Sequence, residues 1–416
     1  MKLLKFCMVT TFYPPYNFGG DGVFVYRLAN ALANRGHEVH VIHDQDAFTL
    51  LSKNLPTSIY NHPNITLHPL RGGDLASLDL VLIHQLGRPV SKHEQIKTIL
   101  ENNDFDVIHF HNVSLLGGPG ILQYGRATKL CTLHDHWFVC AMHVLWRFDR
   151  EPCTQRTCSS CTLAGHRPLQ IWRYTGAIER SVQHVDAFIA PSHFAQQSHL
   201  INGFPASIHY LPHFLPNIEV DAINSVAEVH QHPRPYFLFV GRLEKIKGVQ
   251  VLLEQFRTYQ SADLLIVGAG TYEAELKALA KELPHVHFLG RIDHGQLREI
   301  YRQAIAVIVP SLCYETFGLV PIEAFATSTP AIVHNLGALP EVVQVGGGLV
   351  YRTNEELLNA MELLRTQPDL RNQLSQQGYR NFLENYTEEQ HLSRYFQLIQ
   401  RFQNSRVAKK ELTHST

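Results

Sequence analysis

Two glutamates, Glu315 and Glu323, flank a glycine-containing loop in the segment 310–326. Apolar residues before this segment predict a strand, and Pro321 suits the first turn of the helix that follows. Backbone N–H groups at such a helix N-terminus bind phosphate or sugar oxygens readily. We therefore expect both carboxylates to face one ligand, the alternative being a surface loop with a capping carboxylate. The peptide groups concerned are those of Phe317, Gly318, Leu319 and Val320.

Fixed positive charges follow an earlier predicted strand at 236–240. Arg242 and Lys247 stand in the turn after it, and Gly268 stands in the turn after the next strand. Two cations near a turn often form only a solvated face, and a glycine often serves only the turn. Together with the glutamate segment, they favour a site in which fixed cations stabilise an anionic group of a ligand.

The N-terminal half has candidates of its own at the ends of predicted strands. Gly19 and Gly20 belong to a glycine-rich loop that opens a helix, where the backbone either approaches a phosphate closely or simply turns. His111 ends one strand and His134 follows another, which directs both toward one edge of a sheet. The chain has 26 histidines, so a structural role for each remains the alternative.

Four of the seven cysteines cluster in an insert at 137–166. The last two have the Cys-x-x-Cys spacing of metal ligands, and four thiolates would complete a tetrahedral zinc site. Reduced thiols or a redox disulfide, and an iron–sulfur cluster, are the alternatives. We expect the catalytic step to need no cofactor. The four residues are Cys140, Cys153, Cys158 and Cys161.

The elements that must position these residues are short apolar runs alternating with amphipathic stretches, a pattern that predicts parallel sheets covered by helices. The pattern stops and restarts, so we expect two doubly wound α/β domains facing each other across a cleft, where ligands of open α/β sheets bind. The predicted strands are 6–10, 39–43, 78–84, 107–111, 129–133, 188–190, 207–211, 236–240, 264–267, 286–289, 306–309 and 331–333.

The domain boundaries follow from the same pattern and from the prolines. The first domain is predicted at 1–212, a proline-rich linker at 213–235 and the second domain at 236–385. A helix at 386–403 is expected to pack back on the first domain. The polar tail 404–416 is predicted to be disordered.

Composition sets broad limits. Hydrophobic residues make up 45% and charged residues 18% of the chain, which is enough apolar material for two cores. The formal net charge of -1 gives no sign of a nucleic-acid partner. The N-terminal apolar stretch is short and is interpreted as a strand, and no apolar run reaches the roughly 18 residues of a membrane span. We expect a cytoplasmic protein, including one at the inner face of a membrane.

The segment 123–180 is basic and carries apolar side chains among its arginines. Such a stretch can lie against an anionic membrane surface. A solvated helix over the first domain is the alternative.

The segment with Glu315 and Glu323 resembles the E-x7-E signature of the retaining glycosyltransferase family 4, whose fold is the two-domain GT-B architecture. Residues 240–248 resemble the family's strand-to-helix turn, and further matches extend over most of the chain. The resemblance implies sugar transfer from a UDP-, GDP- or ADP-sugar to a glycan or lipid-linked acceptor. The insert after His134 is similar to one in family members that build bacterial surface polysaccharides.

The resemblance also implies roles for single residues of the second domain. Glu315 would meet the hydroxyl groups of the donor sugar, and Glu323 the ribose. The peptide groups at 317–320 would hold sugar and phosphate oxygens. Arg242 and Lys247 would neutralise the diphosphate. The remaining donor-side matches are Gly268, beside the nucleotide, and Arg291 and Ile292, beside the base.

In the first domain, Gly19 and Gly20 would contact the donor phosphate and the acceptor. His111 would contact the transferred sugar or the acceptor, and His134 the acceptor region. No carboxylate nucleophile is evident beside them, which agrees with the same-face displacement proposed for the family, with the donor phosphate as base.

One position departs from the family pattern, and three other functions compete with transfer. Ser328 stands where the family has glycine after the signature helix, a place that favours left-handed backbone. The competing functions are a glycan phosphorylase, a sugar-nucleotide epimerase and a non-catalytic sugar-nucleotide-binding protein. A phosphorylase needs a phosphate or lysine-bound cofactor motif that the sequence lacks, the signature segment favours transfer over epimerisation, and the presence of Arg242, Lys247 and Glu315 argues against loss of catalysis.

Overall fold

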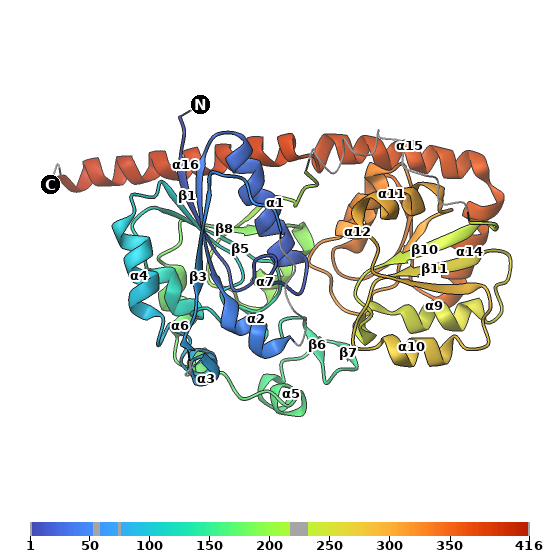
Figure 1. Ribbon diagram of the computed structural model, residues 1–416, viewed down its shortest axis with the longest axis horizontal. Coiled ribbons are helices and arrows are strands. Elements are labelled where there is room, and N and C mark those ends of the chain that lie inside the picture. Colours follow the sequence, from blue (N-terminus) through green and yellow to red (C-terminus); the bar gives the residue numbers. More distant parts are fainter. Residues whose placement is uncertain (1, 53–58, 74–75, 217–231, 415–416) are drawn as a thin grey trace.

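The chain forms two α/β lobes, and its last two helices lie along them, α15 (Pro368–Asn385) on the C-terminal lobe and α16 (Glu388–His414) on the N-terminal lobe (Figure 1). The structure, a computed structural model, describes residues 2–52, 59–73, 76–216 and 232–414. Most of the predicted linker at 213–235 lies outside these residues. Each lobe is built on a parallel sheet with helices on both faces, so the predicted pair of doubly wound α/β domains is confirmed.

The N-terminal lobe contains a seven-stranded sheet in the order β3-β2-β1-β4-β5-β8-β9, and all its strand pairs are parallel. Its central strands are buried on both faces, which explains why they are almost continuously apolar. The strands are β1 (Lys5–Val9), β2 (Glu38–Asp44), β3 (Ile65–Leu70), β4 (Val107–Phe110), β5 (Thr128–Thr132), β8 (Ala187–Ala190) and β9 (Ile208–Tyr210).

Helices cover this sheet, and the cysteine-containing insert adds a small hairpin and a short helix beside it. The helices are α1 (Gly20–Asn34), α2 (Gln45–Leu51), α3 (Ala76–Leu86), α4 (His93–Asn102), α5 (Cys158–Ala164), α6 (Ala177–Val182) and α7 (His193–Ile201). Among the described residues, the lobe also contains the 3-10 helices η2 (Pro119–Gln123) and η3 (Ile171–Tyr174) and the hairpin of β6 (Trp146–Arg147) and β7 (Glu151–Pro152).

The C-terminal lobe has a six-stranded parallel sheet in the order β12-β11-β10-β13-β14-β15. Its strands are β10 (Tyr236–Val240), β11 (Asp263–Val267), β12 (Val286–Gly290), β13 (Val307–Val309), β14 (Ala331–His334) and β15 (Gly348–Tyr351). Its helices are η5 (Lys245–Lys247), α9 (Val249–Phe256), α10 (Glu273–Leu279), α11 (His294–Gln303), α12 (Leu319–Ala326), α13 (Leu339–Gln344), α14 (Asn354–Thr366) and α15 (Pro368–Asn385).

The last helix, α16 (Glu388–His414), returns to the N-terminal lobe and runs along it (Figure 1). Leu392, Tyr395 and Ile399 are fully buried in the core of that lobe, around β1 and α1. Where the chain crosses back, Leu215 donates its N–H to the carbonyl of Tyr386 at 3.0 Å, so the two interlobe crossings lie side by side. Because the lobes are joined by two adjacent segments of the chain, the distance to which they can separate is limited.

The structure corrects three expectations from the sequence. Residues 78–84, predicted as a strand, belong to helix α3, whose Leu78 and Val81 are exposed, so the apolar run does not mark a sheet core. The tail at 404–416, predicted to be disordered, continues α16 to His414 because good helix formers such as Arg, Ala, Lys and Glu follow without a Gly or Pro. Strands β3 and β15 were not predicted, because the first is half exposed and the second starts within a run of glycines.

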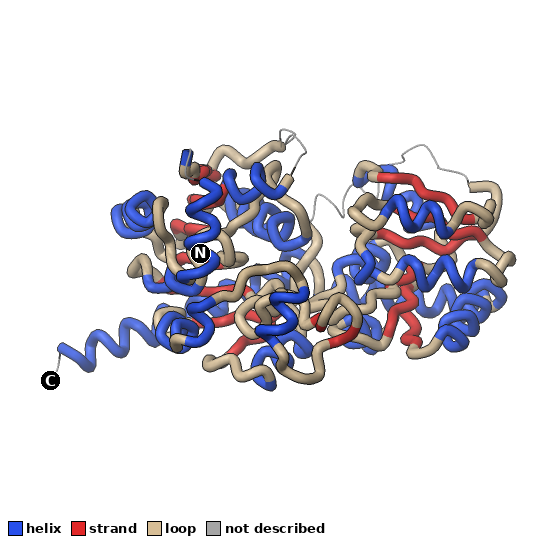
Figure 2. The backbone as a smooth tube through the Cα atoms, turned by 90° about the horizontal axis from the view of Figure 1, so that it is seen from below, coloured by secondary structure: helices blue, strands red, loops and turns tan. Residues whose placement is uncertain are grey.

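The end of α16 projects beyond the N-terminal lobe (Figure 2). Among the helices that the structure describes, none is both long and apolar enough to cross a membrane.

Ser328 follows helix α12 and has the left-handed backbone that the sequence predicts at this position, with φ of 57°. Ser328→Gly should raise the unfolding free energy by roughly 0.5–1 kcal/mol, because relief of left-handed strain exceeds the entropy that glycine adds to the unfolded chain. Urea titration measures the change. Ser328→Ala is the matched control and should not stabilise, and equal effects of both substitutions would contradict the strain.

Candidate functional site between the lobes

The carboxyl edges of both sheets meet at a cavity of about 460 Å³ whose lining comes from both lobes. The cavity unites residues that lie far apart in the sequence. The predicted site residues that line it are Gly19, Gly20 and His134 from the N-terminal lobe and Arg242, Lys247, Glu315, Phe317, Gly318, Leu319 and Val320 from the C-terminal lobe.

The centre of the C-terminal wall is an ion pair between Lys247 and Glu315, with Nζ 2.6 Å from Oε1. Ser311 donates its hydroxyl to the same carboxylate oxygen at 2.6 Å. Burial would raise the pKa of Glu315, but the Lys247 ammonium and the Ser311 hydroxyl hold that pKa below its ordinary value. Glu315 is thus an ionised acceptor, not a proton donor. Arg242 is exposed on the same wall and adds positive potential toward this carboxylate.

A close approach between two loops creates this pair. Gly248 follows Lys247 with φ of 77°, and a Cβ there would lie 2.0 Å from the carbonyl oxygen of Pro310. Only glycine lets the turn after β10 reach the loop after β13, where Leu312 donates its N–H to the Ile246 carbonyl at 2.8 Å. Lys247 and Glu315 follow β10 and β13, which are neighbours in the sheet, and this contact between the two loops brings them together.

Helix α12 points its N-terminus at the same cavity. Its N-cap, Gly318, supplies no side-chain cap, so the first N–H groups of the helix stay available to a ligand. Pro321 occupies the first turn, as predicted. Together with the helix dipole, this end offers N–H donors and positive potential beside Lys247 and Arg242.

The glycine loop of the N-terminal lobe closes the cavity from the other side. Gly19 caps α1, and a Cβ on Gly20 would lie 3.6 Å from the side chain of Leu319. Asp21, in the first turn of α1, also lines the cavity and accepts a hydrogen bond from Asn112 at 3.0 Å. The two helix N-termini, of α1 and α12, therefore face each other across the site.

Three histidines of the N-terminal lobe lie one behind another, from the cavity into the core. His134 lines the cavity, and its Nε2 is 2.9 Å from Nδ1 of His111, which is fully buried behind it. His109 lies deeper, with Nδ1 2.8 Å from the hydroxyl of Tyr395 on α16, which makes it structural. Burial lowers the pKa of His111 and of His134, so both are neutral and act as hydrogen-bonding groups.

Several predicted site residues lie away from the lining. Gly268 has φ of 138°, and a Cβ there would be 1.8 Å from the Gly241 oxygen, so it lets two strand-end turns touch. Arg291 and Ile292 follow β12 and do not line the cavity. Glu323 accepts a hydrogen bond from Tyr301 at 2.9 Å, and its other oxygen lies 3.8 Å from Arg27 of α1 in the opposite lobe.

His213 is a residue of the cavity that was not predicted from the sequence. Its ring stacks on Phe24 at 3.9 Å and meets Phe317 edge-on at 5.0 Å, so it lines the cavity where the lobes join. It follows β9 closely, so the strand-end rule that selected His134 also applies to it. Burial lowers its pKa well below the ordinary value.

Direct hydrogen bonds join the lobes around the cavity. Thr316 donates its hydroxyl to the His134 carbonyl at 2.7 Å, and Ser192 donates to the Thr316 carbonyl at 2.7 Å. Glu341 of α13 accepts the first N–H groups of α7, from His193 at 2.9 Å and from Phe194 at 3.0 Å. A carboxylate at a helix N-terminus is a favourable partner for the helix dipole.

The four clustered cysteines are free thiols in this structure. Cys161 accepts the N–H of Phe148 at 3.5 Å, and burial together with neighbouring thiols raises the pKa values of Cys140 and Cys153. Among the described residues, the only group of three or more potential metal ligands within 4.8 Å of one another lies elsewhere, at His232, Asp263 and His287. The thiols as placed do not form a closed set of zinc ligands, and the zinc site stays a prediction.

Comparison with known proteins identifies the chain. The family described as "Glycosyltransferase Family 4" matches residues 18–216, and "Glycosyl transferases group 1" matches residues 222–381, one for each lobe. The chain is a glycosyltransferase of family 4. The predictions of this family, of the GT-B fold and of an enzyme are thereby confirmed.

Relatives of this family 4 glycosyltransferase span most of its length. A glycogen synthase of Mycobacterium tuberculosis is 28% identical over 82% of this chain and 80% of its own. A phosphatidyl-myo-inositol mannosyltransferase of Mycobacterium leprae is 25% identical over 80% of each. Among solved structures, sucrose-phosphate synthase of Thermosynechococcus elongatus has the same fold, with a TM-score of 0.75, 20% identity and coverage of 97% and 100%.

The buried histidines predict how stability depends on pH. Burial lowers the pKa of His391, on α16, to about 4, which is below the value of an unfolded histidine. The unfolded chain therefore takes up the proton first, and stability is lost as pH falls from about 6.5 toward 4. His391→Gln should make the fall in unfolding free energy shallower by at most about 1.4 kcal/mol per pH unit.

Urea unfolding of both proteins between pH 7 and 5 measures the slope. His184→Gln is the control, because His184 is exposed and its replacement should leave the slope unchanged. An unaltered slope in His391→Gln would contradict the burial effect.

Proposed function

We propose that this enzyme transfers a sugar with retention of configuration from a nucleoside diphosphate sugar to a glycan or lipid-linked acceptor. The observation that carries the proposal is the Lys247–Glu315 pair beside the uncapped N-terminus of α12. A diphosphate placed there meets two fixed cations and the N–H groups of the helix, while Glu315 accepts from sugar hydroxyls. A solved structure with the same fold, Anabaena Alr3699/HepE in complex with UDP (TM-score 0.68, 15% identity), supports a nucleotide donor.

The transfer step needs no covalent carboxylate in this arrangement. The bond from the anomeric carbon to the diphosphate breaks with its electrons on the leaving oxygen, where Lys247 and Arg242 offset the developing charge. The acceptor oxygen attacks from the same face and gives its proton to the departing phosphate. Of the other carboxylates lining the cavity, Asp135 is held by His143 at 2.9 Å, and Asp21 by Asn112 at 3.0 Å.

The N-terminal lobe supplies the acceptor side. Its glycine loop and His134 face the donor wall, and His111 fixes the orientation of His134 from behind. The names of the relatives support both acceptor classes, since one is a glycogen synthase and another is a phosphatidyl-myo-inositol mannosyltransferase. Assembly of bacterial surface polysaccharide is the pathway we infer, on the resemblance of the cysteine insert.

A lipid-linked acceptor would suit contact with the inner face of a membrane. Exposed apolar side chains lie on α3 and on η3, which touch each other, with exposed Arg88 and Arg167 nearby in the sequence. Ile171 and Tyr174 are 60% and 65% exposed, whereas Trp172 is buried and donates its indole N–H to the His84 carbonyl. Sedimentation with anionic phospholipid vesicles measures this contact.

One activity screen tests both which sugar nucleotide the enzyme uses and whether Lys247 and Glu315 belong to its active site. Purified protein is screened against UDP-, GDP- and ADP-sugars for release of the nucleoside diphosphate, and the anomeric configuration of the product is read by NMR. We expect one donor class to be used, with Lys247→Ala and Glu315→Gln each lowering turnover by roughly 10²–10³-fold.

Lys277→Ala is the matched control, because Lys277 is exposed on α10 and pairs only with Glu273 among the ion pairs described. Full activity in Lys247→Ala, or an inverted product, would overturn the proposal.

A further inference from the structure

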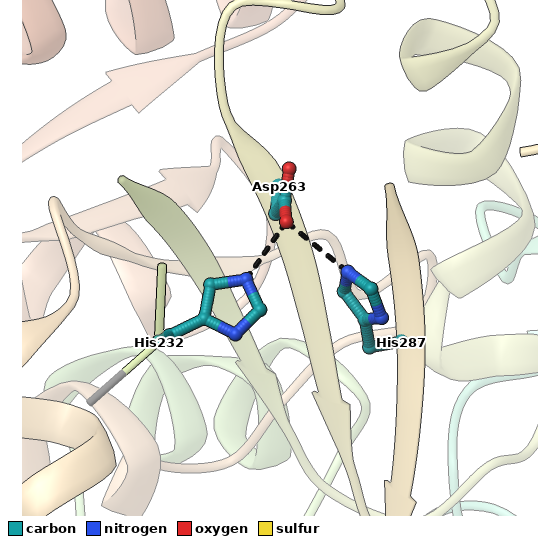
Figure 3. Close-up of side chains that lie close together, drawn as sticks. All are labelled: His232, Asp263 and His287. Atoms are coloured by element: carbon teal, nitrogen blue, oxygen red, sulfur yellow. Dashed lines mark hydrogen bonds and ion pairs between the residues drawn. The ribbon is translucent and has the colours of Figure 1, made fainter. Parts of the chain in front are cut away.

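Three potential metal ligands converge at the amino edge of the C-terminal sheet, at the opposite end of the strands from the cavity. His232 precedes β10, Asp263 opens β11 and His287 is the second residue of β12 (Figure 3). These three strands are neighbours in the sheet, and Leu265 of β11 is in register with His287. Parallel strands bring their first residues to one edge for the same reason that they bring their last residues to the other.

The donor atoms lie close together. Nε2 of His232 is 2.7 Å and Nε2 of His287 is 3.1 Å from the same oxygen, Oδ2 of Asp263, and all three atoms lie within 4.8 Å of one another. Bonds of about 2.0–2.1 Å to a zinc-like ion would set its ligands roughly 3–3.4 Å apart. Small rotations of the imidazole rings would therefore open the group around one ion.

A neighbouring arginine orients the carboxylate. Arg234 Nη1 lies 3.0 Å from Oδ1 of Asp263, which leaves Oδ2 to the two imidazoles. The Asp263 side chain is 5% exposed and that of His287 is 37% exposed, so the carboxylate is buried while the His287 side of the group faces solvent. An open side lets water complete the coordination of an ion.

We propose that His232, Asp263 and His287 form a binding site for one divalent transition-metal ion of the zinc type. Two imidazoles with one carboxylate favour zinc, nickel, cobalt or copper over magnesium and calcium, which prefer oxygen ligands. The adjacent guanidinium offsets the charge of Asp263, so the site binds less tightly than one with a second carboxylate. The ion would join the chain entering β10 to β11 and β12, and it takes no part in sugar transfer.

The alternative is a pair of imidazole N–H groups donating to one buried carboxylate, which accounts for the same distances without an ion. Metal binding separates the two. After removal of metal with EDTA, the full-length protein is dialysed against Zn²⁺, and bound zinc is counted by mass spectrometry. Wild type should hold one equivalent more than His287→Ala and His232→Gln, or bind that equivalent at least tenfold more tightly.

His184→Ala is the control and should match wild type, because it removes an exposed histidine outside the group. Any zinc held by the cysteine insert is common to all four proteins and cancels in the comparison. Zinc should also raise the melting temperature of wild type more than that of His287→Ala. Equal zinc content and equal shifts in all folded variants would overturn the site, whatever the enzyme's transfer activity.

Discussion

The cavity between the lobes depends on the half-buried ion pair of Lys247 and Glu315. It ties the turn after β10 to the loop after β13, and Gly248 makes the approach of the two loops possible. Removing either partner would leave a desolvated charge, so each residue holds the other in place before a donor arrives. The wall that we propose to bind the donor diphosphate is therefore arranged in advance, which is how an enzyme avoids reorganisation during the reaction.

Hydrogen bonds between the lobes also join the two walls of the cavity. Thr316, beside Glu315 in the wall from the C-terminal lobe, donates its hydroxyl to the carbonyl of His134 in the wall from the N-terminal lobe. Glu341 caps α7 across the same interface, and α16 returns to bury Tyr395 in the N-terminal lobe. These contacts fix the position of the two walls relative to each other, so a change in one wall is transmitted to the other.

Strands that are buried on both faces could be predicted from the sequence because their apolar runs are continuous. Some cavity residues could be predicted because the carboxyl ends of parallel strands lie at one edge of a sheet. Prediction failed where burial is partial: the apolar run at 78–84 is a half-exposed helix, and β3 is an edge strand. Contacts between residues that are distant in the sequence could not be predicted either. Arg27 beside Glu323 and His213 against Phe317 arise only when the lobes dock.

The central claim is that a nucleoside diphosphate binds between the N-termini of α12 and α1. Hydrogen exchange with and without the nucleoside diphosphate that binds best tests it directly. We expect slower exchange of the backbone amides at 317–320 and at Gly19 and Gly20, with little change at the amino edge of the C-terminal sheet. Protection at neither helix N-terminus in a saturated protein would contradict it.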